Sequence, residues 1–112
     1  MRLEDLEPHE QLALAGLVRM LTRMDGELSP EETAAISGLA RELGSPAFWA
    51  SMAEAQEQLG TPGAVTAAAE GVTRAEARAW IYGMLLGLAA ADGIDVAETQ
   101  MLDWLMTKWE LG

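Results

Sequence analysis

Apolar side chains recur along the chain every three to four residues, which is the period of an α-helix. Leu14, Leu17 and Leu21, for example, fall on one face of a first helical stretch. Such stretches are separated by glycines and by Ser-Pro or Thr-Pro pairs, which are typical of helix ends and helix starts. No stretch shows the two-residue alternation of an amphipathic strand. We therefore predict an all-α fold, a single bundle of about six helices, at residues 8–24, 30–43, 46–59, 62–70, 74–91 and 96–109.

The stretch 74–91 is apolar nearly all round, with Trp80 and Leu85 on different faces. A helix of this kind is normally buried on every side. We therefore expect it to be the central helix of the bundle. Gly83 and Gly87 lie four residues apart in it, a spacing that indicates close packing against a neighbouring helix.

Two parts of the chain, residues 10–44 and 74–111, share one pattern. Each contains an apolar helix, an Asp-Gly pair, a hydrophobic residue, a capping residue, a glutamate three positions later and a second amphipathic helix. The apolar positions of the two parts also correspond. Those of the first part, Leu14, Leu17, Val18 and Leu21, match Ile81, Met84, Leu85 and Leu88 of the second part, in this order. We expect two pseudo-symmetric helical hairpins within one domain, residues 1–112, joined by the helices between them.

The charge of the chain restricts its partners. Among 112 residues, 18 are acidic and 7 are basic, which gives a formal net charge of −11. Such a charge repels nucleic acids and anionic lipids, so neither is an expected partner. The charge favours cations and basic surfaces of other proteins. A homo-oligomer is an open alternative.

The expected location follows from three features of the sequence. The longest apolar run, residues 79–91, is shorter than the roughly 20 residues of a membrane-spanning helix, so direct membrane insertion is not expected. The first ten residues are acidic and do not resemble a signal peptide. The chain has no cysteine, which excludes disulfides and thiolate metal sites and is compatible with a reducing compartment. We expect a cytoplasmic protein.

The two Asp-Gly turns resemble a known family. Residues 25–32, Asp-Gly-Glu-Leu-Ser-Pro-Glu-Glu, are similar to the signature turn of tellurite-resistance TerB-like domains. Residues 92–98, Asp-Gly-Ile-Asp-Val-Ala-Glu, are similar to its second occurrence, although this turn is one residue shorter. The resemblance extends over most of the chain. It implies an all-helical module, linked to tellurite resistance and stress response, whose acidic residues hold a divalent cation. The residues that match the family's acidic positions are Asp25, Glu32, Asp92 and Glu98.

The residue types in the turns agree with a site for a hard cation. Calcium and magnesium prefer carboxylate and carbonyl oxygens, so either ion is the candidate cofactor. Glu27, Glu31 and Asp95 would add further carboxylates to such a site. Neither turn has the alternating oxygen ligands of an EF-hand loop.

Helix capping is the alternative explanation of the same residues. Asp95 suits an N-cap, and Glu32 and Glu98 suit the matching positions of a capping box. Capping does not explain Asp25 and Asp92, because each follows the end of an apolar helix, where a negative charge is unfavourable.

The sequence gives little support to catalysis. His9 is the only histidine, so neither a plausible Ser-His-Asp triad nor a zinc site with several histidines can be assembled. No Walker-type phosphate loop is present. We expect a protein that is not an enzyme and has no catalytic residues.

A metal-free protein–protein interaction or scaffold domain, with a dimer as one form, is the alternative to cation binding. The tryptophans bear on this alternative. Trp80 and Trp109 fit the core. We expect Trp49 and Trp104 in the core as well, but either of them would mark a partner surface if it were exposed.

Overall fold

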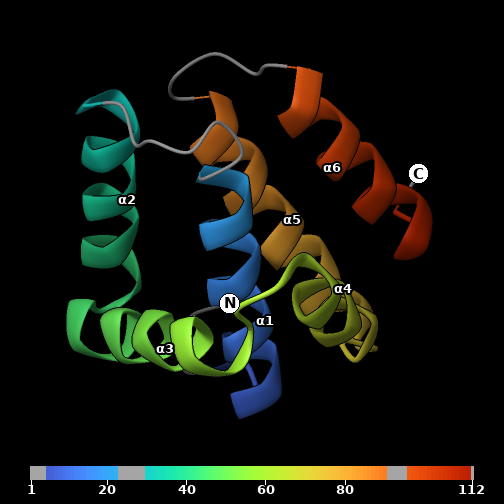
Figure 1. The fold of residues 1–112 in the computed structure, drawn as a ribbon, viewed down its shortest axis with the longest axis horizontal. Coiled ribbons are helices and arrows are strands. Elements are labelled where there is room, and N and C mark those ends of the chain that lie inside the picture. The colour runs from blue at the N-terminus through green and yellow to red at the C-terminus, as the bar shows by residue number, and fades with distance from the viewer. Residues whose placement is uncertain (1–4, 23–29, 91–95, 112) are drawn as a thin grey trace.

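The computed structural model describes residues 5–22, 30–90 and 96–111. Over these ranges the chain forms six α-helices and no strand, which confirms the all-α prediction (Figure 1). The helices are α1 (Pro8–Thr22), α2 (Pro30–Leu43), α3 (Ser45–Gln58), α4 (Pro62–Glu70), α5 (Ala75–Ala90) and α6 (Val96–Lys108).

Local chemistry determines where these helices begin and end. At the start of α4, the Thr61 hydroxyl oxygen accepts a hydrogen bond from the backbone N–H of Ala64 at 3.2 Å, and Pro62 takes the first helical position. Gly44 separates α2 from α3 with a φ of 94°, a left-handed conformation that glycine adopts without steric strain. The chain can therefore turn between α2 and α3 within a single residue.

The helices pack around α1. This helix packs on α3, α4 and α5, while α2 packs on α3 and α5, and α6 packs on α5. In Figure 1, α1 and α5 occupy the middle of the bundle, with α2 on one side and α6 on the other. Each predicted hairpin therefore has one inner helix, α1 or α5, and one outer helix, α2 or α6. The symmetry between the hairpins stays a prediction.

The apolar positions that correspond between the two hairpins form the core. In the first hairpin the buried ones are Leu14, Leu17, Val18, Leu21, Ile36 and Leu39. In the second they are Ile81, Leu85, Leu88, Leu102, Leu105 and Trp109. From the connecting helices, Phe48 of α3 is almost completely buried as well.

The helix α5 is less buried than its apolar sequence predicts. Ile81 and Leu85 are completely buried, but an exposed side of the helix carries Ala79, Gly83, Leu86, Gly87 and Ala90. A Cβ atom placed on Gly83 or Gly87 would meet no described atom within 4 Å, so the predicted close packing at these glycines is wrong. The central helix is instead α1, in which residues 13–18 are all buried. Alanine and glycine made α5 look apolar all round, although neither residue requires burial.

No helix within the described ranges is both long enough and apolar enough to cross a membrane.

Candidate functional site

The predicted cation ligands fall outside the part of the chain that the structure describes. This applies to the whole of Asp25, Glu27, Asp92 and Asp95, and to the side chains of Glu31, Glu32 and Glu98. The backbone does place two of them. Glu32 is the third residue of α2, and Glu98 is the third residue of α6. Both glutamates therefore occupy the same helical position, the one that a capping box uses.

The helices that flank the two turns end on the same side of the molecule. α1 and α5 pack on each other and run in the same direction in Figure 1. Their C-terminal ends and the N-terminal ends of α2 and α6 all lie in the upper half of that view, with the end of α1 lower than the other three (Figure 1). We call this side, defined by the ends of α1 and α5 and the starts of α2 and α6, the turn edge.

A buried ion pair lies at the other end of α1. Glu10 is completely buried, and its carboxylate accepts hydrogen bonds from Arg74 Nε at 2.9 Å and from Arg74 Nη2. It also accepts one from the backbone N–H of Glu7 at 2.7 Å. The last bond is half of a capping box, because Glu10 is the third residue of α1. Arg74 Nη2 donates a further hydrogen bond to the carbonyl oxygen of Asp5 at 3.0 Å.

Each partner stabilises the charged form of the other. The hydrogen bond from Arg74 lowers the pKa of Glu10 below its ordinary value of 4.5, although burial opposes this effect. The same hydrogen bond raises the pKa of Arg74. Both groups are therefore charged at neutral pH, and the pair fixes the start of α1 to the segment that leads into α5.

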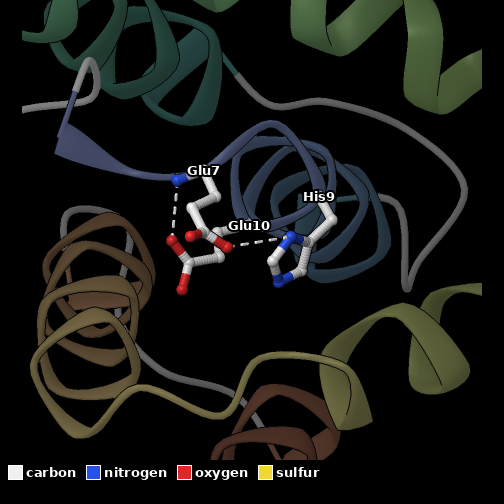
Figure 2. A group of neighbouring side chains, drawn as sticks. All are labelled: Glu7, His9 and Glu10. Atoms are coloured by element: carbon white, nitrogen blue, oxygen red, sulfur yellow. Dashed lines mark hydrogen bonds and ion pairs between the residues drawn. The ribbon is translucent and has the colours of Figure 1, made fainter.

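Glu7, His9 and Glu10 form a cluster with the composition of a metal site (Figure 2). One ligand atom from each lies within 4.8 Å of the others, and His9 Nδ1 is 3.5 Å from Glu7 Oε2. However, both oxygens of Glu10 already accept hydrogen bonds. Arg74 donates two of these bonds, and the backbone N–H of Glu7 donates the third. A metal ion would have to displace that guanidinium, and Glu7 and His9 alone are two exposed ligands. We therefore interpret the cluster as part of the structural ion pair.

Glu10 and Arg74 are not among the functional residues that the sequence predicts. One signal was present, because Glu10 follows Glu7 by three residues at a helix start, which is the spacing of a capping box. No local pattern links Glu10 to Arg74, since the two are 64 residues apart.

Two open grooves lie on the surface of the described residues. The first, about 420 Å³, runs between α2 and α5 and is lined by Gly38, Leu39, Glu42, Gly83, Met84, Gly87 and Leu88. We call it the α2–α5 groove. The second, about 400 Å³, lies between α1 and the connection from α3 to α4, with Met20, Leu59 and Pro62 among its lining residues.

The four tryptophans differ in exposure. Trp109 is buried, and its Nε1 donates a hydrogen bond to the carbonyl oxygen of Ala69 at 2.9 Å. Trp80 and Trp104 are partly buried against the core. Trp49 is 46% exposed, so its predicted place in the core is wrong. Its ring contacts that of the buried Phe48 edge-on, with 5.3 Å between the ring centroids. Trp49 is therefore the tryptophan that can offer an aromatic surface to a partner.

Comparison with known proteins identifies no relative of this chain: no family model, no curated protein and no solved structure matches it.

Proposed function

We propose that the chain is a non-enzymatic, TerB-like acidic module of the cytoplasm that binds a divalent cation, calcium or magnesium, between its two Asp-Gly turns. The observation that supports this proposal most is the common direction of α1 and α5, whose C-terminal ends share the turn edge (Figure 1). Asp25 and Asp92 follow these two helices in the sequence. A link to tellurite resistance and stress response follows from the family resemblance and is part of the same proposal.

The distribution of basic residues also supports the proposal. Arg41 is in the last turn of α2, Lys108 is in the last turn of α6, and Arg74 precedes α5. All three lie at the helix ends opposite the turn edge. These helices have 13 to 16 residues, or about 20 to 24 Å at 1.5 Å per residue, which exceeds the screening length of about 8 Å at physiological salt. Of the described basic residues, Arg19 in the last turn of α1 lies nearer to the edge.

Arg23 also precedes the first turn in the sequence, two residues before Asp25, but the seven acidic residues at positions 25, 27, 31, 32, 92, 95 and 98 outnumber Arg19 and Arg23. Like charges that are brought together raise each other's pKa or recruit a cation. Hard divalent ions bind such oxygen ligands directly. The buried carboxylate of Glu10 is already held by Arg74, so it is not available as an acid or base, which agrees with a non-catalytic role.

Isothermal titration calorimetry with calcium, magnesium and manganese chlorides tests the proposal. The informative variant is Asp25→Asn/Asp92→Asn. Its matched control is Glu54→Gln/Glu57→Gln, which removes the same charge from exposed positions of α3. We expect the wild type and the control to bind equally and the Asp25→Asn/Asp92→Asn protein to bind at least about tenfold more weakly. A wild type that releases no heat with any of the three ions, or a double variant that binds as well as the wild type, would show the proposal to be wrong.

A metal-free protein interaction or scaffold domain is the second candidate function. The half-exposed ring of Trp49 favours it, since tryptophan is enriched among residues that dominate protein interfaces. Sedimentation equilibrium distinguishes a dimer from a monomer. If a dimer forms through this surface, Trp49→Ala should dissociate it while the melting temperature of the subunit stays nearly unchanged. A dimer that Trp49→Ala leaves intact would exclude this surface as the dimer interface.

A further inference from the structure

The α2–α5 groove has an apolar floor, and the exposed side of α5 beside it is uncharged. Leu39 of α2 and Met84 and Leu88 of α5 line it. On the outer side of α5, Leu86 is 40% exposed. The exposed positions of α5 from residue 79 to residue 90 carry no charge. An uncharged surface of this kind is unusual on a chain with a net charge of −11, and the groove volume of about 420 Å³ is within the range of binding pockets.

Three glycines keep the groove open. A Cβ atom added to Gly38, Gly83 or Gly87 would meet nothing within 4 Å among the described residues. Glycine is among the poorest helix formers, so helix stability alone favours alanine at all three positions. The described packing does not require glycine there. What the glycines provide is access for another backbone to approach α2 and α5 closely.

Charge identifies the kind of occupant. Among the residues whose side chains the structure describes, Glu42 is the one ionisable residue that lines the groove. No ion pair joins it to another residue of the described ranges. A lysine or arginine on an incoming chain could pair with it. A second copy of this protein is disfavoured, because it would bring another net charge of −11 to the same surface.

We propose that the α2–α5 groove binds an amphipathic α-helix of a basic protein partner. The apolar face of that helix, with residues at the spacing i, i+3, i+4 and i+7, packs on Leu39, Met84 and Leu88. A basic residue at its border pairs with Glu42. This inference rests on the second proposed function, protein interaction, and is independent of cation binding.

The test uses a fluorescein-labelled peptide of 18 residues, built from leucine, alanine and lysine, with its apolar residues on one helical face. A peptide of identical composition with the apolar residues dispersed is the control for charge attraction. The blocking variant is Gly83→Leu, which fills the groove and also improves helix propensity, so the protein stays folded. Gly63→Leu is the matched variant, because Gly63 of α4 is exposed and also has nothing within 4 Å of an added Cβ atom.

Fluorescence anisotropy should show that the amphipathic peptide binds the wild type and Gly63→Leu equally. We expect Gly83→Leu to bind it at least about tenfold more weakly, as when a partner's anchor residues lose their pocket. Glu42→Gln should weaken binding about two- to fivefold and reduce its dependence on salt.

Several outcomes would overturn the inference. They are no binding of the amphipathic peptide to the wild type, equal binding by Gly83→Leu, and equal binding of the dispersed peptide. Self-association of the wild type that Gly83→Leu abolishes would assign the groove to a second copy instead. If Trp49→Ala abolishes peptide binding and Gly83→Leu does not, the groove assignment falls while protein interaction stands.

Discussion

Replacing Glu10 with alanine removes a completely buried carboxylate that accepts three hydrogen bonds. Loss of one partner from a buried ion pair costs about 3–5 kcal/mol. The side chain of Arg74 is 34% exposed and can regain water, so we expect the lower end, about 3 kcal/mol. Domains are stable by only about 5–15 kcal/mol. With an unfolding entropy of about 2.1 cal/mol/K per residue, the melting temperature should fall by about 13 °C.

Urea unfolding at pH 7, followed by far-ultraviolet circular dichroism, measures this loss. Glu76→Ala is the control, because Glu76 lies 3.7 Å from the same guanidinium but its side chain is 61% exposed. A surface pair of this kind contributes little, so the control should unfold nearly as the wild type does. If Glu10→Ala is no more destabilising than Glu76→Ala, Glu10 and Arg74 do not fix the start of α1 in the way we describe.

The pH dependence gives an independent test of the same pair. The pKa of Glu10 is lower in the folded protein than its ordinary value of 4.5. Its ionised form therefore stabilises the fold fully above about pH 4.5, and this stabilisation is lost as the pH falls through the lowered pKa. The stability difference between the wild type and Glu10→Gln, which cannot titrate, should shrink below pH 4.5. A difference that stays constant down to pH 3, or that grows, would refute the assigned direction of the pKa shift.

Two further predictions concern stability elsewhere. Gly87→Ala should raise the free energy of unfolding by about 0.5–1 kcal/mol, because alanine is a better helix former than glycine. The added methyl group meets no described atom, since it enters the open α2–α5 groove. A lower melting temperature would mean that something fills this space. Trp109→Phe should lower the free energy of unfolding by about 1–3 kcal/mol, because the carbonyl oxygen of Ala69 loses the Nε1–H donor; urea unfolding checks this, and an unchanged midpoint would show that this hydrogen bond contributes little.

Most of the fold was predictable because its signals are local. The prolines at positions 8, 30 and 62 and Gly44 mark helix boundaries within one or two residues. The apolar stripe of α1 is buried as its period predicts. Long-range features were not predictable in this way. The pairing of Glu10 with Arg74 depends on how distant segments meet, and the exposed side of α5 depends on which helices cover it.

The candidate sites were also hard to predict, because they depend on which helix faces meet in the folded protein. Phe48 and Trp49 are neighbours on α3, yet one is almost fully buried and the other is half exposed. Adjacent residues point about 100° apart on a helix, so the sequence places them on different faces without saying which face meets the core. The α2–α5 groove was missed because two glycines four residues apart are compatible with either close packing or open space.

The central proposal is that both Asp-Gly turns contribute to one cation site at the turn edge. Titration of manganese(II) chloride into the ¹⁵N-labelled protein tests it most directly, because the paramagnetic ion broadens the amide signals of nearby residues. We predict that signals from residues 25–28 and 92–95 broaden together at substoichiometric manganese and that excess magnesium restores them. Broadening confined to one turn, or centred on Glu7 and His9, would contradict a shared site.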